Sequence, residues 1–296
     1  GAVARMTTDN GKTMIIDSHC HAWPRWPYEP PVPDDESRGL VEQLLFEMDQ
    51  NGVDRAVLVC ARIERNPDDN DYGAGCVKRF PDRLDMFADV DCSWWETYQA
   101  PGASDRLRWA SEAYPMKGFT HYVKGDDDGS WYLGEEGTRF FETARELKLI
   151  ASLAIGAQLQ PVVRQLAERF PEVPFLCHHM AGARVGDPDR LATICASAQA
   201  PNVYIKMSGF SYAMNERKWD YPYHETHDVI RGLYDAFGPD RMCWGSDYPV
   251  VRRYMTHQHS LEAFRSHCTF IPEADREKIL GPSLKALLDA ARDIQI

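Results

Sequence analysis

Short apolar runs recur along the whole chain and are separated by longer segments of mixed polarity. Near-continuous runs of this kind are typical of strands that are buried on both faces. From this pattern we expect strands at 14–16, 55–60, 84–90, 117–123, 149–155, 173–177, 203–207 and 241–245.

The segments between these runs show helical periodicity. In 37–51, Leu40, Leu44 and Met48 fall on one face of a helix. The same spacing of apolar residues occurs over 140–147, 159–170 and 229–237, and Gly238 then stands where a helix C-cap glycine is expected. Each of these segments is therefore predicted to be an amphipathic helix.

Alternation of buried strands and amphipathic helices predicts a parallel sheet covered by helices. Eight such units close into an α/β fold of the (β/α)₈ TIM-barrel type. A doubly wound open sheet is the alternative, but no G-x-G-x-x-G or Walker sequence follows the first apolar run. We expect one barrel domain over 13–296, preceded by a disordered or expression-derived N-terminal segment over 1–12, with Met6 as the native initiator.

Composition narrows the classes of partner. The 296 residues carry a net charge of −12, which argues against nucleic acid and anionic membrane surfaces as partners. No apolar run approaches the ~18 residues of a membrane span, and residues 1–12 lack the apolar region of a signal peptide. None of the eight cysteines forms a CxxC pair, so reduced thiols and a cytoplasmic location are expected. Homo-oligomerisation is left open.

Ionisable residues gather where the apolar runs end. The first run leads into IIDSHCH, in which His19 and His21 are two residues apart and so share one face of an extended segment. In a barrel the carboxyl ends of the strands carry the chemistry. The other candidates at such ends are His121, Lys124, His178, His179, Lys206, Ser208 and Asp247.

The motifs IIDSHCH, LCHHMAG, NVYIKMSG and CWGSDYP, in this order, resemble the amidohydrolase superfamily. The chain is most similar to the amidohydrolase-2 group, which includes 2-pyrone-4,6-dicarboxylate lactonase and sugar-acid lactonases. The resemblance extends over about residues 13–290 and implies a (β/α)₈ barrel with mostly hydrolytic chemistry. It also implies a reaction centre made of His19, His21, one histidine of the sixth strand and Asp247.

Two departures from the family pattern matter. Relatives usually read D-H-x-G at the sixth strand, which makes His179 the functional residue and places His178 at the aspartate position. Lactonase relatives often have an arginine on the fourth strand where this chain has Thr120 or His121. The absence of that arginine argues against a dicarboxylate substrate.

The same histidines and carboxylate could hold a metal. His19, His21, His179 and Asp247 are a suitable donor set for Zn²⁺ or Mn²⁺. The fifth apolar run, LIASLAI, has no histidine, which removes the basis for a two-metal centre. One divalent ion and metal-free catalysis both remain open.

The interpretation is a hydrolase that opens a lactone or related ester of a small organic or sugar acid. Water attacks, and Asp247 accepts its proton as general base. His19, His21 and His179 hold the metal or donate hydrogen bonds to the developing oxyanion. Arg25, His121, Lys124, His178, Lys206 and Ser208 are candidates for binding the substrate.

Each candidate has a structural alternative. Asp247 could cap a helix, and His179 could be a hydrogen-bonded core residue. Lys206 could reach the surface, Lys124 could pair with the neighbouring aspartates, and Arg25 could stack on nearby tryptophans.

Rival functions are a Zn-dependent decarboxylase, a hydratase acting on an unsaturated or aromatic acid, and a non-enzymatic scaffold. The loops 24–33 and 126–136 are long enough to be lids over the site.

Overall fold

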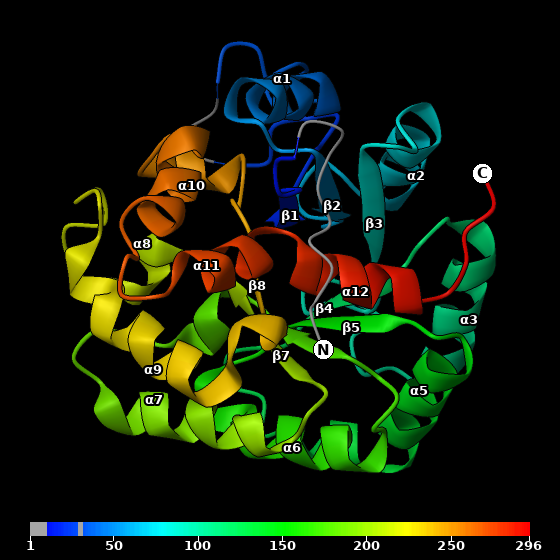
Figure 1. The fold of residues 1–296 in the computed structure, drawn as a ribbon. Helices are drawn as coiled ribbons and strands as arrows, with labels where there is room; N and C mark the ends of the chain where they lie inside the picture. The colour runs from blue at the N-terminus through cyan, green and yellow to red at the C-terminus, as the bar shows by residue number, and fades with distance from the viewer. Residues whose placement is uncertain (1–10, 29–31) are drawn as a thin grey trace.

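The computed structural model describes residues 11–28 and 32–296. The predicted segment 1–12 therefore lies mostly outside the described residues. Within the described part, eight parallel strands form one sheet in the order β1 to β8 (Figure 1). Their bounds are β1 Ile16–Cys20, β2 Arg55–Val59, β3 Leu84–Asp89, β4 Gly118–Tyr122, β5 Ile150–Ala154, β6 Phe175–Cys177, β7 Val203–Met207 and β8 Met242–Trp244.

The sheet closes on itself between β8 and β1. Cys20 bridges to Tyr248 in parallel, and the His21 amide donates to the Tyr248 carbonyl at 2.7 Å. Gly245 lies at this seam, where a Cβ atom would come within 2.8 Å of the Ser18 hydroxyl oxygen. The predicted (β/α)₈ barrel is confirmed, and each of the eight predicted strands overlaps an observed one.

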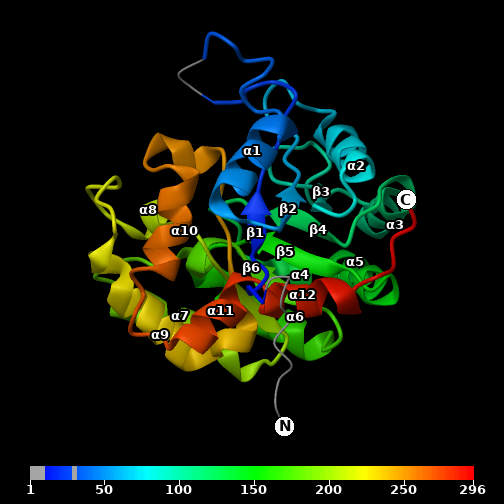
Figure 2. The same cartoon turned by 45° about the horizontal axis from the view of Figure 1, so that its top comes forward.

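Helices surround the sheet (Figures 1 and 2). The helices that follow the first five strands are α1 Val41–Asn51, α2 Asp69–Arg79, α3 Ala103–Ala113, α4 Ser130–Leu133, α5 Glu135–Glu146 and α6 Gln160–Arg169. The later ones are α7 Pro188–Cys195, α8 Phe210–Ala213, α9 His227–Phe237, α10 His257–Arg265, α11 Glu273–Leu280 and α12 Pro282–Ala290. The amphipathic segments predicted from spacing correspond to α1, α5, α6 and α9, and Gly238 is the C-cap of α9 with φ of 73°.

Helix α12 closes the amino-terminal end of the barrel. Leu284, Leu287 and Leu288 pack against side chains inside the barrel, among them Ile16 and Ile150. Beyond the helix, the Arg292 carbonyl accepts a hydrogen bond from Lys117, just before β4. Figure 2 shows α12, in red, near the beginning of β1. The ionisable residues singled out from the sequence, among them His19, His21, His179 and Asp247, lie toward the opposite, carboxyl-terminal end of the barrel.

No helix among residues 11–28 and 32–296 is long and apolar enough to cross a membrane. All eight cysteines lie in the described part, and each is a free thiol.

Candidate active site

A β-bulge in β1 aims the paired histidines into the barrel. Ile16 belongs to the interior cluster and Cys20 to the outer core, so strict alternation would have pointed His19 outwards. The register with β2 shifts between Asp17 and Cys20, and the extra residue reverses the alternation. His19 and His21 therefore lie with their ring centroids 4.9 Å apart at the mouth of the barrel.

The side chain of Asp17 holds this bulge in place. Its Oδ1 accepts from the backbone amide of His19 at 3.0 Å and from that of Ser246 at 2.9 Å. The Ser246 hydroxyl donates to its Oδ2. Asp17 thus ties the bulge of β1 to the loop that carries Asp247.

His179 follows β6 in a left-handed turn, since His179, Met180 and Ala181 all have φ between 48° and 55°. Three consecutive non-glycine residues in this region are strained, and such strain is found at functional sites. Gly209 leaves the room that the turn needs, because a Cβ atom there would lie 2.9 Å from the Cβ of His179. The His179 ring is oriented by Ser208, whose hydroxyl lies 2.9 Å from Nδ1.

Asp247 follows β8 and also has a positive φ, 58°. Its backbone amide donates to the His19 carbonyl at 2.7 Å. Its Oδ2 accepts a hydrogen bond from the Tyr212 hydroxyl at 2.7 Å. The other oxygen, Oδ1, is left to face the histidines.

Three imidazoles converge on this oxygen. The distances from Asp247 Oδ1 to the Nε2 atoms of His21, His19 and His179 are 3.4, 3.5 and 3.9 Å. The four residues predicted to form the reaction centre are thus brought together, although they come from positions spread over most of the chain.

A buried polar chain lies beneath them. Lys206 is fully buried, and its Nζ lies 2.9 Å from Nδ1 of His19. It also donates to the Ser152 hydroxyl at 2.8 Å, and that oxygen lies 2.7 Å from Nε2 of His178. Lys206, His178 and Ser208 therefore support the reaction centre from behind, and Lys206 does not extend to the surface.

Burial sets the charges of this centre. It lowers the pKa of His19 and His178 well below the usual value, with Lys206 adding to the effect, and it lowers the pKa of His179 to about 4. Burial also lowers the pKa of Lys206 to about 7. For Asp247, burial acts to raise the pKa, but His179, His21 and the Tyr212 hydrogen bond outweigh it and the pKa falls below its ordinary value. At neutral pH, Asp247 is ionised.

These residues fit a metal ion. The Nδ1 atom of His21 lies 2.6 Å from the Val59 carbonyl, which can only accept, so Nδ1 carries the proton. In the neutral ring, Nε2 then presents a lone pair to the carboxylate, which is unfavourable unless a cation or a proton lies between them. The Nε2 atom of His19 is buried without a hydrogen-bond partner in the described structure. His19, His21 and Asp247 thus form a candidate metal site, and His19, His178 and His179 form an overlapping one.

A cavity of about 380 Å³ opens above the reaction centre. His21, His179 and Asp247 form part of its wall. The remainder is largely aromatic or apolar and consists of Trp23, Tyr28, Ala61, Ile63, Trp94, Tyr122, Tyr212, Val250 and Arg253. The volume is that of a small-molecule pocket.

None of the six predicted substrate-binding residues lines this cavity. Lys206, His178 and Ser208 lie beneath the reaction centre, and the other three lie elsewhere. His121 points to the outer layer, where Nδ1 donates to the Val90 carbonyl at 3.0 Å and Nε2 accepts from Tyr132. Lys124 is exposed and lies over the ring of Tyr98. Arg25 pairs with Asp68 at 2.9 Å.

The two predicted lids give different outcomes. Residues 29–31 of the loop 24–33 lie outside the described residues, but Tyr28 of the same loop lines the cavity. The loop 126–136 contains helix α4 and the beginning of α5, and none of its residues lines the cavity.

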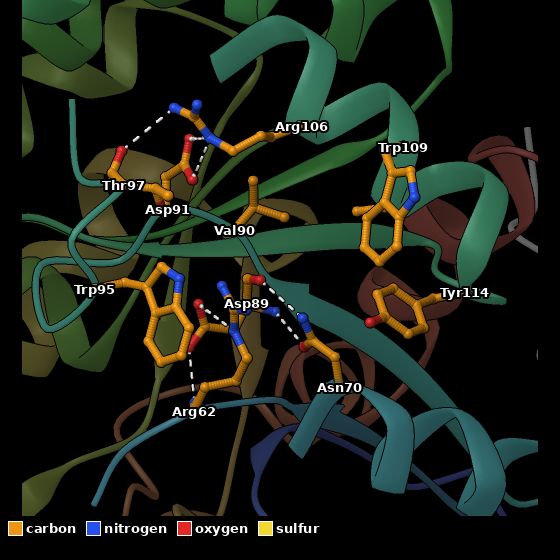
Figure 3. Close-up of a pocket in the computed structure, with 11 residues that line it drawn as sticks. Arg62, Asn70, Asp89, Val90, Asp91, Trp95, Thr97, Arg106, Trp109 and Tyr114 are labelled. Atoms are coloured by element: carbon orange, nitrogen blue, oxygen red, sulfur yellow. Dashed lines mark hydrogen bonds and ion pairs between the residues drawn. The ribbon is translucent and has the colours of Figure 1, made fainter. Parts of the chain in front are cut away.

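A second hollow lies away from this centre, beyond the end of β3 (Figure 3). Its polar groups pair with one another: Asp91 accepts two hydrogen bonds from Arg106, and Asp89 accepts from the Arg62 amide at 2.7 Å. Its volume is about 100 Å³. These pairs hold the segment after β3 in place.

Several site residues were not predicted from sequence: Tyr28, Tyr122, Ser152, Tyr212 and Arg253. Tyr122 is the neighbour of His121 and faces inwards because alternate residues of a strand face opposite ways. Both faces of a barrel strand are apolar, so the sequence pattern does not show which side is inner. A polar serine within the apolar run LIASLAI was the one available signal for Ser152.

A sequence profile of the amidohydrolase family matches residues 16–282, so the chain belongs to this family. The predicted resemblance is confirmed. A curated relative, the uncharacterized protein y4mH of Sinorhizobium fredii (strain NBRC 101917 / NGR234), is 26% identical over 180 residues. That match covers 57% of this chain and 59% of the relative's own length.

Solved structures share the fold. A zinc-bound amidohydrolase from Burkholderia multivorans aligns with a TM-score of 0.72 at 18% identity, covering 93% of this chain and 99% of the other. A probable 2-pyrone-4,6-dicarboxylic acid hydrolase from Acinetobacter baumannii aligns at 0.71 and 17%, with the same coverage. The 2,6-dihydroxybenzoate decarboxylase from Rhizobium aligns at 0.68 and 17%, covering 94% and 99%. The chain is thus similar in fold to both hydrolases and decarboxylases.

Proposed function

We propose that this amidohydrolase opens a lactone, or a related ester, of a small organic or sugar acid. The observation that carries the proposal is the position of Asp247. Its Oδ1 lies 3.4–3.9 Å from the Nε2 atoms of three imidazoles, and the residue borders the cavity. A carboxylate so placed can accept a proton from a water held between it and a bound carbonyl.

The chemical step is an addition followed by ring opening. The water oxygen forms a bond to the lactone carbonyl carbon while Asp247 takes the water proton. The ring C–O bond then breaks, and the leaving oxygen receives that proton, so the product is a hydroxy acid. Tyr212 keeps Asp247 oriented through Oδ2, which leaves Oδ1 free for the transfer.

The donor set suits one divalent ion, Zn²⁺ or Mn²⁺, held by His19, His21, His179 and Asp247. When bound, such an ion would polarise the carbonyl and acidify water. The zinc-bound relative supports this part of the proposal. In a metal-free enzyme, an imidazole N–H would stabilise the oxyanion instead.

A metal-dependent decarboxylase is the second candidate. It is supported by the likeness in fold to 2,6-dihydroxybenzoate decarboxylase and by the aromatic wall that Trp23, Tyr28 and Tyr122 form. Decarboxylation would release CO₂ and needs no water as nucleophile, so its products separate the two activities.

The test is a panel of lactones and aromatic acids, assayed with metal-replete and chelator-treated protein of measured metal content. We expect lactone opening, and we expect Asp247→Asn to lower kcat/KM by about 10³-fold because the general base is lost. The matched control is Asp240→Asn, since Asp240 is exposed and lies before β8. Release of CO₂ without lactone opening, or full activity in Asp247→Asn, would contradict the proposal.

A further inference from the structure

The cavity above the reaction centre has two formal charges among its described lining residues, those of Asp247 and Arg253. Asp247 is engaged by the three imidazoles and by Tyr212. Arg253 is therefore the charged group of the wall that remains available to a ligand.

Arg253 is held at the rim of the cavity by the loop that carries Asp247. It ends the 3₁₀ helix Val250–Arg253, which begins directly after the Asp247-Tyr248-Pro249 segment. The guanidinium carbon lies 4.2 Å from the ring centroid of Tyr28, another wall residue. Stacking fixes the plane of the guanidinium while leaving its N–H groups at the edge of that plane free.

Those N–H groups have no partner in the described structure. Among residues 11–28 and 32–296, Arg253 makes no ion pair, and no carbonyl or carboxylate accepts a hydrogen bond from it. Most other arginines that stack on rings here also pair with an acceptor; Arg62, for example, lies over Trp95 and beside Asp89. A planar guanidinium fork with free donors matches the two oxygens of a carboxylate.

The rest of the wall points to the shape of the ligand. Trp23, Tyr28, Trp94, Tyr122 and Tyr212 line the same cavity as Arg253 and Asp247. Aromatic faces favour a planar ring, whereas a sugar lactone would need several polar partners for its hydroxyl groups. The wall residues Ala61, Ile63 and Val250 supply no side-chain polar group.

We propose that Arg253 binds the carboxylate of a planar, ring-shaped lactone acid and so determines specificity, while the lactone carbonyl faces Asp247. This inference rests on the proposed function and deepens it by naming the substrate class. It also places the anion-binding arginine on the loop after β8, whereas the family pattern predicts one on the fourth strand.

The test compares an acid with its own ester. Coumalate, a 2-pyrone carboxylate, and methyl coumalate share the lactone ring and differ in the negative charge. For Arg253→Met we expect kcat/KM for coumalate to fall by about 30-fold, mainly through KM, because a charge-assisted hydrogen-bonded pair is lost. The kcat/KM for methyl coumalate should stay within about twofold of the wild-type value, since no carboxylate is present.

The matched control is Arg252→Met, which removes the same charge from the adjacent residue. Arg252 is exposed and does not line the cavity, so both substrates should react as in the wild type. The proposal would be overturned if Arg253→Met lowered kcat/KM equally for coumalate and methyl coumalate, or for neither. It would also be overturned if Arg252→Met lowered kcat/KM for coumalate selectively.

A binding measurement separates this proposal from the proposed reaction. Isothermal titration of wild-type protein and Arg253→Met with benzoate, a planar ring acid with one carboxylate and no lactone, reports the anion site without chemistry. Suppose that Arg253→Met weakens binding about 30-fold but the wild-type protein opens no lactone. The lactonase function would then be refuted, and the carboxylate site would be retained. Equal binding by both proteins, or binding by neither, would refute the carboxylate site.

Discussion

At the scale of single residues, the site depends on which atom of each side chain is already engaged. The Val59 carbonyl accepts a hydrogen bond from Nδ1 of His21, and the Tyr212 hydroxyl donates one to Oδ2 of Asp247. What remains free, Nε2 and Oδ1, points to a common place. The hydrogen bonds on the far side of each group thus determine what it can offer to a substrate or a metal.

The Tyr212 hydrogen bond gives a prediction about pH. It contributes to lowering the pKa of Asp247, so Tyr212→Phe should raise that pKa. In the proposed reaction Asp247 acts in its ionised form, so the acid limb of the kcat/KM profile should move to higher pH. Activity would then be lost earlier as the pH falls.

The matched control is Tyr122→Phe, which removes a hydroxyl from the same cavity wall. In the described structure the Tyr122 hydroxyl does not bond to Asp247, so the acid limb should keep its wild-type position. Profiles of kcat/KM for the two variants measure the difference. An unmoved limb in Tyr212→Phe would show that another group controls the acid side.

At the scale of elements, a single irregular strand determines where the chemistry faces. The β1 bulge reverses the alternation after Ile16, and Asp17 closes it by accepting from the His19 and Ser246 amides. These contacts also set the position of the β8 loop relative to β1. The bulge is therefore part of the active-site architecture.

Replacement of Asp17 tests this role. Asp17→Ala should destabilise the protein by roughly 3 kcal/mol, because two buried amides and the Ser246 hydroxyl lose their acceptor. Asp17→Asn keeps a carbonyl oxygen that can accept from the two amides, so its free energy of unfolding should fall clearly less than that of Asp17→Ala. Urea unfolding of both variants measures the free energies, and equal stability of Asp17→Ala and the wild type would exclude the proposed link.

At the scale of the whole molecule, the candidate site and the leucine-rich packing of helix α12 lie at opposite ends of the barrel. Helix α12 fills the amino-terminal end with leucines, whereas the polar residues of the site lie at the carboxyl-terminal end. Each end can change with little effect on the other, a division that is usual for this fold.

Leu284→Ala tests the separation. Leu284 is fully buried against the interior cluster, and its truncation should lower the free energy of unfolding by about 2–5 kcal/mol. The kcat/KM of the folded fraction should remain near the wild-type value, because the cavity lies at the opposite end. Thermal unfolding together with an activity assay below the transition measures both effects, and a large loss of kcat/KM at full folding would contradict the separation.

The sequence by itself determined the class of fold and named the residues of the candidate site. Alternating apolar runs and amphipathic segments predict eight β/α units. Strands buried on both faces give continuous apolar runs, whereas helices buried on one face give apolar residues at helical spacing. His19, His21, His179 and Asp247 were among the candidates because ionisable residues are unusual at the ends of buried strands, and the family resemblance singled them out.

Only the tertiary structure decided which way the side chains point and what they touch. His121, predicted to bind substrate, faces outwards, and its neighbour Tyr122 faces the barrel interior. When both faces of a strand are apolar, the sequence does not show which residues face inwards. Tyr212 and Ser152 join the site through hydrogen bonds to residues far from them in the chain, and Arg253 stacks on Tyr28, from the opposite end of the chain. Local sequence encodes burial and periodicity, whereas a bulge, a strand register and a loop position arise from pairing between distant segments.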